Sequence, residues 1–161
     1  MSPSSPLLRL YHRFLRWPFG GWLFSRAVCF KAPYFGTIHP RITLLEAGRC
    51  EARIPHRRGV QNHIGSVHAI ALCNLAELCS GVMIDASIPN DMRWIPKGMT
   101  VRYLKKAMGP QTGIATPTIP IVSTSEGYDL PIAVIVRDAN GVTTFEAEVT
   151  MWLTPKPRRA D

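Results

Sequence analysis

The sequence predicts an α+β fold in which a curved antiparallel β-sheet wraps around one long apolar helix. Several segments from residue 37 onward alternate between apolar and polar residues in the way that is typical of strands. One stretch, residues 66–82, lacks proline and is apolar on every side when its residues are arranged as a helix. Such a helix must be enclosed on most sides, and because the other elements of the main body are strands, the enclosing structure is a bent sheet.

Length and composition indicate one globular domain. The chain has 161 residues, of which 46% are hydrophobic and 19% charged, so it can bury a substantial core. Its net charge of +8 favours negatively charged partners, such as nucleic acid, anionic lipid or phosphate-bearing small molecules. We expect no nucleic-acid partner, because the excess lies near the start and no nucleic-acid-binding motif is present. The first 45 residues hold no acid and six bases: Arg9, Arg13, Arg16, Arg26, Lys31 and Arg41.

A basic amphipathic helix is predicted at the start of the chain, ending near Trp17-Pro18. Its apolar residues recur at helical spacing and its arginines occupy the other side. This helix either packs on its own domain or a neighbouring subunit, or makes peripheral membrane contact through residues 7–17. Its apolar stripe consists of Leu7, Leu10, Tyr11, Phe14 and Leu15. We therefore divide the chain into a basic amphipathic helical extension (1–35), a main domain (36–155) and a tail (156–161).

The main domain contains a hairpin, the apolar helix and four further strands. The last strand alternates most clearly, with Phe145, Ala147, Val149, Met151 and Leu153 on one face. Its other face carries Thr144, Glu146, Glu148 and Thr150. Strands are predicted in a hairpin at 37–55 that turns at Ala47-Gly48, and at 100–106, 111–118, 130–137 and 142–153.

Two polar residues, Asn74 and Glu77, stand in the middle of the apolar helix. They are three residues apart and so share one helix face. Burying an unpaired ionised carboxylate costs several kcal/mol, so Glu77 is either paired, protonated, or located at a cavity that water and substrate reach. The structural alternative is a glutamate satisfied by Asn74 or by an arginine from another strand.

Residues 62–77 resemble the signature of hotdog-fold acyl-CoA thioesterases of the phenylacetyl-CoA and 4-hydroxybenzoyl-CoA type, N-x-x-G-x-x-H-G-G-x-x-x-x-L-A-D/E. A weaker resemblance, to Y-L-R/K-P-A followed by glycine, begins at Tyr103. Together the two motifs imply a hotdog fold over residues 36–155. This chain departs from the signature at the glycine pair, where Ala69 and Ile70 stand. The residues in register are Asn62, Gly65, His68, Leu75, Ala76 and Glu77.

The resemblance implies an acyl-CoA thioesterase that forms a homodimer or homotetramer. Glu77 would act as nucleophile or as general base toward water. Backbone amides around His68 and Ala69 would stabilise the oxyanion. Asn62 would polarise the carbonyl or position water, commonly across a dimer interface, and Gly65 would let the backbone approach the thioester. The loss of the glycine pair leaves open the alternative of a non-catalytic protein that binds acyl-CoA or fatty acyl chains.

Further residues are candidates for substrate binding. The side chain of Ile70 would shape the acyl channel, and Asn74 would orient the Glu77 carboxylate. Coenzyme A carries a diphosphate and a 3′-phosphate, which basic side chains can bind. Ordinary solvated surface charge is the alternative for each base. The candidate bases are Arg57, Arg58, Arg102, Lys105 and Lys106.

Neither a metal nor another cofactor is expected. The four cysteines form no CxxC pair, so reduced thiols and a cytoplasmic location are expected, although the arginine-rich start also fits a mitochondrial transit peptide in outline. His63 and His68 are five residues apart and would not share one helix face. Serine-hydrolase elbows, Walker A loops and dinucleotide-binding glycine motifs are all missing from the sequence.

Overall fold

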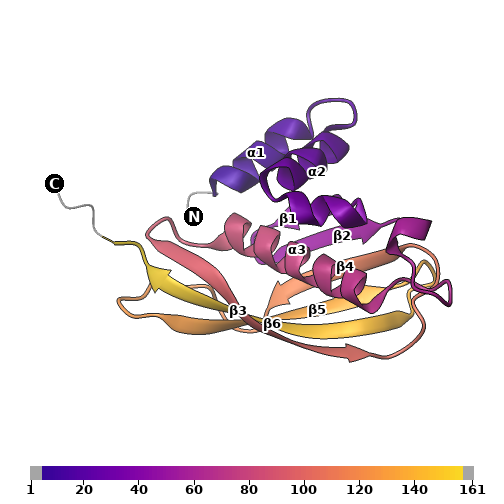
Figure 1. Ribbon diagram of the computed structural model, residues 1–161. Helices are drawn as coiled ribbons and strands as arrows, with labels where there is room; N and C mark the ends of the chain where they lie inside the picture. Colours follow the sequence, from indigo (N-terminus) through magenta and orange to yellow (C-terminus); the bar gives the residue numbers. More distant parts are fainter. Residues whose placement is uncertain (1–4, 158–161) are drawn as a thin grey trace.

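Six strands form one curved antiparallel sheet, and the long helix α3 lies along its concave face (Figure 1). The computed structural model describes residues 5–157, so the ends of the predicted extension and tail lie outside the described residues. The strand order is β1-β2-β4-β5-β6-β3, and every neighbouring pair is antiparallel. The strands are β1 (Arg41–Glu46), β2 (Arg49–Ile54), β3 (Met92–Tyr103), β4 (Gln111–Pro117), β5 (Tyr128–Arg137) and β6 (Thr143–Pro155). The helices are α1 (Pro6–Phe14), α2 (Gly20–Lys31) and α3 (Ala69–Ser87), with short 3₁₀ turns η1 (Pro33–Ile38) and η2 (Arg58–Val60).

The enclosure of α3 confirms the predicted hotdog fold. The helix packs most closely against β1, β2, β4, β5 and β6, and it also reaches β3, where the Trp94 Nε1 group donates to Asp85 Oδ1 at 2.7 Å. The side chains of Leu75, Leu78 and Met83 have no exposed surface. By length and composition α3 could cross a membrane, but 72% of its apolar window is buried within the protein itself. It is therefore the core of the domain, covered by the sheet.

Strand β6 follows the predicted alternation, with one exception. Its five predicted core residues, from Phe145 to Leu153, are all buried. Thr144, which was assigned to the polar face, is also buried, with 1% of its surface exposed. Its hydroxyl donates to the Gln111 Oε1 atom at 2.7 Å, so two buried polar side chains satisfy each other. The irregular register where β5 meets β6, at Val136 and Arg137, accompanies this departure from the predicted alternation.

Strand β3 is much longer than the sequence predicted and ends earlier. It spans Met92–Tyr103, whereas only 100–106 was expected. Proline and glycine disfavour strands, and the structure has a register shift between Pro96 and Gly98. Both residues are tolerated because β3 lies at the edge of the sheet and pairs with β6 on one side only.

The extension folds as a helical hairpin, α1–α2, against the sheet and α3. Tyr11 on α1 is 4% exposed and stacks edge-on against Phe24 of α2, with ring centroids 5.0 Å apart. The Ser25 hydroxyl accepts the Ile42 N–H at 2.9 Å and so joins α2 to β1. The first helix therefore packs on its own domain, and most of its apolar stripe is used there. Leu10 and Leu15 remain exposed.

The close packing of α3 on β4 predicts a large effect from one methyl group. A Cβ atom at Gly113 would lie 3.0 Å from Leu75 Cγ and 3.2 Å from Cys79 Sγ. We expect Gly113→Ala to lower the free energy of unfolding by about 1–3 kcal/mol, measured by urea denaturation. Gly21→Ala is the control, because its Cβ would meet other atoms only at 3.8 Å or beyond and alanine favours a helix. Equal losses in both variants would contradict the packing argument.

Candidate functional site

The loop before α3, residues 61–67, is a closed turn held together by Asn62. The Asn62 Oδ1 atom accepts the backbone N–H groups of Ile64 and Ser66, both at 3.1 Å. Its Nδ2 group donates to the Ser66 hydroxyl at 2.8 Å. Gly65 has a φ of +80°, a conformation that glycine adopts readily. Asn62 and Gly65 thus shape the loop that leads into the helix, and the Asn62 side chain is engaged in that task.

The backbone amides at the start of α3 are mostly occupied. His68 is the N-cap, and its Nδ1 atom accepts the Ile70 N–H at 3.1 Å, which places the ring proton on Nε2. The His68 N–H donates to the Val60 carbonyl at 2.7 Å, and the Ala71 N–H donates to the His68 carbonyl at 2.9 Å. Among residues 5–157, the Ala69 N–H has no acceptor.

The Ala69 N–H is therefore the donor that can bind an anionic oxygen at this helix start. The first amide of a helix lies at the positive end of its dipole and has no acceptor within the helix. From the sequence, the amides of both His68 and Ala69 were expected to bind the oxyanion. Because the His68 amide is already hydrogen-bonded to Val60, only the Ala69 amide can take that role. The side chain of Ile70, at one of the glycine positions of the signature, is 55% exposed beside it.

A groove of about 230 Å³ opens next to this helix start. Its walls come from η1, from residues 59–61 and from the first two turns of α3. Apolar contributions come from Ile38, Val60 and Ile70. The polar side chains that line it are Tyr34, Thr37, Gln61, His68 and Asn74.

Asn74 is the most deeply placed polar residue of this groove, with 7% of its surface exposed. Its Nδ2 group donates to the Thr37 hydroxyl at 3.3 Å, and that hydroxyl donates to the Tyr34 carbonyl at 2.7 Å. The Asn74 Oδ1 atom is enclosed and has no hydrogen-bond partner among the described residues. The amide is thus held by η1, and no hydrogen bond joins it to Glu77.

Glu77 lies on the side of α3 that the sheet leaves open. The exposed residues of this helix are Ile70, Glu77 and Asp85. Within residues 5–157, Glu77 takes part in none of the ion pairs. The carboxylate is therefore exposed to solvent, but it is not among the residues that line the groove at the helix start. Glu77 is eight positions after Ala69, so the two lie about 12 Å apart along the helix axis.

Cys73 and Tyr103 form a contact on the same open side, which the sequence analysis missed. The Cys73 Sγ and Tyr103 hydroxyl oxygen atoms are 3.3 Å apart. This hydrogen bond, with a smaller contribution from burial, raises the pKa of Tyr103 to about 12. Two signals were present in the sequence. Cys73 stands one helical turn before Glu77, and Tyr103 begins the second motif.

Two of the candidate phosphate-binding bases, Arg57 and Arg58, flank the groove. The Arg57 guanidinium donates to the Thr37 carbonyl and fills the space beside Gly59, where a Cβ would lie 2.1 Å from its Nη1 atom. It is therefore tied to the wall of the groove, whereas Arg58 is exposed to solvent.

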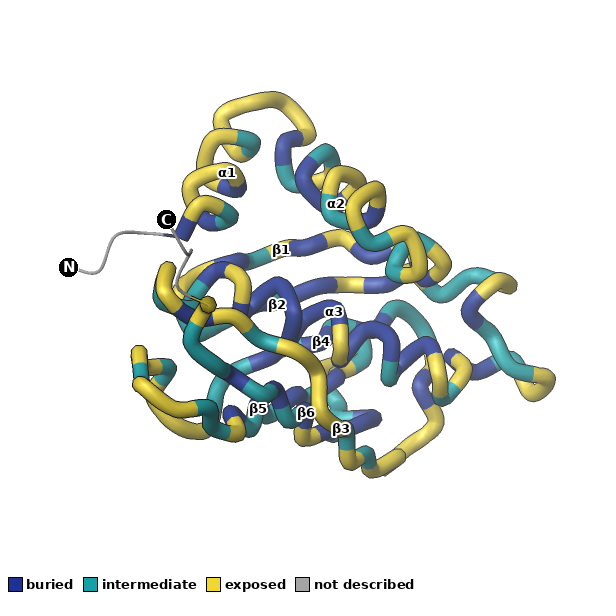
Figure 2. Tube along the Cα trace, turned by 60° about the vertical axis from the view of Figure 1, so that its left-hand side comes forward, coloured by how far each residue is buried: buried dark blue, intermediate teal, exposed yellow. Residues whose placement is uncertain are grey.

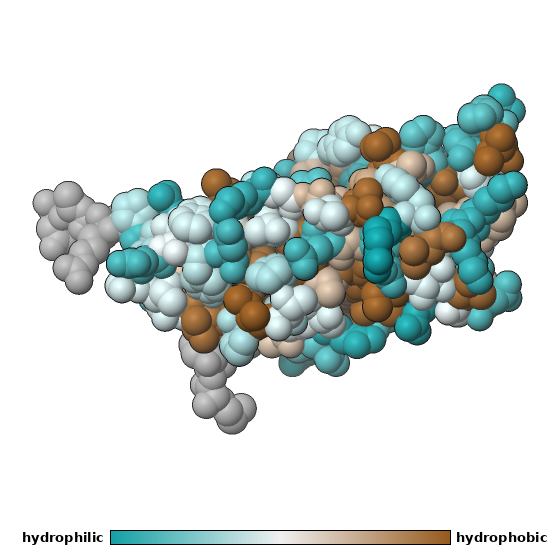
Figure 3. Space-filling model, turned by 90° about the horizontal axis from the view of Figure 1, so that it is seen from below, coloured by the Kyte–Doolittle hydropathy of each residue, from teal (hydrophilic) through white to brown (hydrophobic). Residues whose placement is uncertain are grey.

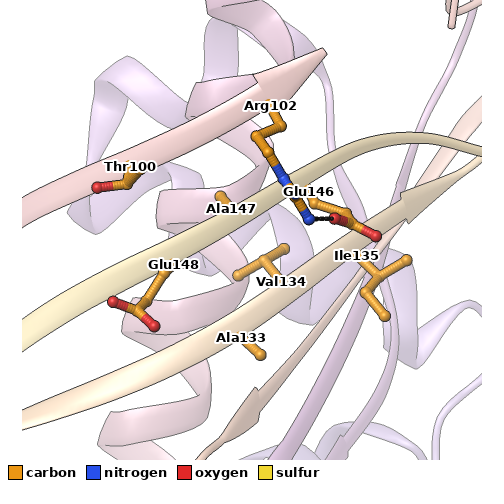
Figure 4. A pocket seen from close by; sticks show the side chains of 8 residues that line it. All are labelled: Thr100, Arg102, Ala133, Val134, Ile135, Glu146, Ala147 and Glu148. Carbon is orange, nitrogen blue, oxygen red and sulfur yellow. Dashed lines mark hydrogen bonds and ion pairs between the residues drawn. The ribbon is translucent and has the colours of Figure 1, made fainter. Parts of the chain in front are cut away.

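Arg102 lies on the opposite face of the sheet from α3. Successive strand residues point to opposite faces, so Arg102 points outward where Tyr103 points toward the helix. Its Nη2 atom is 2.5 Å from Glu146 Oε2, in a shallow hollow of about 330 Å³ (Figure 4). This outer face mixes hydrophilic and hydrophobic residues (Figure 3). Arg102 is thus far from the groove, and Lys105 and Lys106 are exposed beyond the end of β3.

Sequence reasoning also missed three groove residues, Tyr34, Thr37 and Gln61. The expected boundary between extension and main domain, after residue 35, falls within η1, so Tyr34 was not considered with the helix it faces. Gln61 directly precedes Asn62, and that adjacency was the available signal. Within the described part of the chain, no three His, Cys, Asp or Glu side chains cluster in a way that could hold a metal ion.

Comparison with known proteins gives one family match and many structural matches. Residues 20–153 match the family model described as a domain of unknown function, DUF4442. No curated protein matches the chain. A protein solved as a structural-genomics target is 38% identical, covers 93% of this chain and 99% of its own, and superposes with a TM-score of 0.80.

More distant structures share the fold. A protein of unknown function from Pseudomonas aeruginosa, described as a probable thioesterase, is 23% identical over 82% of this chain and 93% of its own, with a TM-score of 0.71. A thioesterase from Haemophilus influenzae is 12% identical over 79% of this chain and 87% of its own, with a TM-score of 0.68. With the family model covering most of the sequence, the chain belongs to the DUF4442 family and has the hotdog fold.

Proposed function

We propose that this protein hydrolyses acyl-CoA thioesters and that Glu77 is its catalytic carboxylate. The observation that carries the proposal is an accessible carboxylate on the open side of an otherwise enclosed helix. The unoccupied Ala69 amide supports it, because thioester hydrolysis needs a donor for the developing oxyanion. Further support comes from the resemblance of residues 62–77 to acyl-CoA thioesterases and from the fold shared with proteins named as thioesterases.

The separation of Ala69 and Glu77 favours a site built from two copies of the chain. About 12 Å of helix lies between them, which is too far for both to contact one thioester carbonyl in a single copy. The outer side of β3 is unpaired, so a second copy could extend the sheet there and bring the two α3 helices side by side, antiparallel. A two-fold axis near Cys73, midway between the two residues, would put Glu77 of one copy opposite the Ala69 amide of the other. Such a homodimer could also assemble into a homotetramer.

In the general-base form of the reaction, the Glu77 carboxylate removes a proton from water as the water oxygen attacks the thioester carbonyl carbon. The carbonyl oxygen becomes an oxyanion and accepts the Ala69 N–H. When the tetrahedral intermediate collapses, the C–S bond breaks and the coenzyme A thiolate takes the proton back from Glu77. The products are a carboxylic acid and free coenzyme A.

In the nucleophilic form, a Glu77 oxygen attacks the carbonyl carbon and expels the coenzyme A thiolate, which is protonated by water. The resulting anhydride between Glu77 and the acyl group is then cleaved by water. A single turnover in ¹⁸O-water distinguishes the two forms, because only the nucleophilic form can leave the label in the Glu77 carboxylate.

A second candidate function is acyl-CoA binding without hydrolysis. The observation that favours it is the helix start itself, where the exposed Ile70 side chain stands at a glycine position of the signature and its amide is held by His68. The Ile70 side chain reduces the space available to a thioester, and the bond to His68 removes one hydrogen-bond donor. Saturable binding of acyl-CoA with no release of free thiol would support this alternative.

Replacing the carboxylate tests the hydrolase proposal. We expect Glu77→Gln to lower kcat by at least about 100-fold, because the amide can neither accept the proton of water nor attack the carbonyl effectively. Release of free thiol is measured across short, medium, long and aromatic acyl-CoAs. Glu148→Gln, an exposed carboxylate on the outer face of the sheet, is the matched control and should keep full activity. Equal rates for the wild type and Glu77→Gln would reject the proposal.

Removing a single N–H group tests the oxyanion donor. Proline is well tolerated at the first position of a helix, and His68, with φ −63° and ψ 139°, already has the backbone conformation that precedes proline. Ala69→Pro should therefore keep the thermal midpoint while lowering kcat about 100- to 1000-fold. Ala69→Gly retains the amide and should keep most of the activity. Full activity in Ala69→Pro would exclude the amide from the mechanism.

Pairing the two inactive variants tests whether the site spans two copies. Co-expression with two affinity tags gives a heterodimer of Glu77→Gln and Ala69→Pro chains. If each site takes Glu77 from one copy and the amide from the other, one of the two sites is intact and the heterodimer has about half the wild-type activity. A site contained within one copy would leave the heterodimer as inactive as its parents.

A further inference from the structure

The α1–α2 hairpin exposes an unusual number of large apolar side chains. Phe19 is 81% exposed, Trp17 66%, Trp22 51% and Leu15 50%. They lie in or beside the connection between the two helices, which stands out from the body of the protein as an exposed loop (Figure 2). An exposed apolar cluster of this kind marks an interaction site.

Three shallow grooves run along this hairpin and form one surface. They have volumes of about 390, 350 and 390 Å³. The first and second grooves share Leu23, and the second and third share Trp22 and Arg41, so the three are continuous. We call this the hairpin surface. Its basic lining residues are Arg13, Arg26, Arg41 and Arg53, and no acidic residue lines any of the three grooves.

The charges of the hairpin surface are not neutralised within the described residues. None of the ion pairs of residues 5–157 includes Arg13, Arg26 or Arg41. The first acidic residue of the chain is Glu46, so the whole hairpin carries bases alone. A partner that fits this surface is therefore anionic, and it also accepts aromatic side chains.

Phe19 adds an independent observation. It has a φ of +60°, in the left-handed region that bulky residues rarely adopt, and it makes no side-chain cap for α2. Asparagine or glycine would relieve that strain, and asparagine would also cap the helix. A phenylalanine at this position thus combines a left-handed backbone conformation with a largely exposed side chain.

We propose that the hairpin surface docks the protein on an anionic phospholipid membrane. Tryptophan and phenylalanine side chains insert at the boundary between headgroups and acyl chains, while arginines extend beside them to lipid phosphates. A protruding tip suits insertion into a membrane, whereas a peptide partner would need an enclosed groove. The uninterrupted positive charge opposes a second copy of the same surface, because the two would repel each other. The contact includes Leu10 and Phe14 of the expected helix stripe but not Tyr11, which is buried in the protein, and it extends into α2.

Co-sedimentation with vesicles tests the proposal on the full chain. We expect binding to phosphatidylcholine vesicles that contain about one third phosphatidylglycerol, much weaker binding to pure phosphatidylcholine, and a loss of binding as salt is raised. Arg13→Gln combined with Arg26→Gln should weaken binding about 20- to 30-fold, because each arginine near the surface contributes about fivefold.

Phe19→Asn separates the docking role from a structural one. This variant should unfold at an equal or higher urea concentration than the wild type, yet bind the anionic vesicles about tenfold more weakly. Phe30→Gln is the matched control: Phe30 is 90% exposed at the other end of α2, outside all three grooves, so its loss should not change binding.

Three outcomes would overturn the proposal. The first is no binding to anionic vesicles, and the second is equal binding to both vesicle types. The third is an equal loss of binding in Phe19→Asn and Phe30→Gln. If the wild type binds no vesicle and Phe19→Asn lowers the mass measured by light scattering, the surface joins two copies of the chain instead.

Discussion

The structure depends on the enclosure of α3 by the concave face of the sheet. A helix with apolar side chains on nearly all sides is stable in water only when other elements cover it, and the sheet does so here. The cover is incomplete along one line, where Ile70, Glu77 and Asp85 are exposed. Since β3 forms the free edge of the sheet beside this line, the packing of the core also decides where a second copy and a substrate can approach.

The same packing explains why the helix start has so little freedom. The loop before α3 is closed by the Asn62 side chain, and the N-cap ring of His68 takes up the Ile70 amide. These bonds fix the backbone and leave the Ala69 N–H as the donor without an acceptor in the described chain. A rigid amide at the positive end of a long helix can stabilise an anion without reorganising, which is the property that an oxyanion site requires.

The two sides of the N-terminal hairpin have different environments. Its buried side, with Tyr11 and Phe24, packs as part of the core. Its outer side exposes aromatic residues and arginines to solvent. The docking proposal gives that outer side a function, and it is independent of the chemistry proposed at Glu77.

How much could be predicted differs between the fold and the site. The sequence predicted the succession of strands along the chain and the enclosed helix between them, because hydrophobic periodicity is a local property of the chain. It missed residues 92–99 of β3, because Pro96 and Gly98 disfavour a strand in general and are tolerated only at a sheet edge. It also placed Thr144 on the wrong face, because a register irregularity and a buried glutamine arise from pairing between strands.

Local pattern and short motifs thus determined the fold class, the position of the carboxylate on the helix and the basic character of the first 45 residues. Only the tertiary structure decided that Glu77 is exposed, that Arg102 points away from the helix toward Glu146, and that Tyr34 joins the groove beside His68. Each of these outcomes depends on which residues from distant segments become neighbours. That is set by the way the sheet closes around α3, and no local periodicity records it.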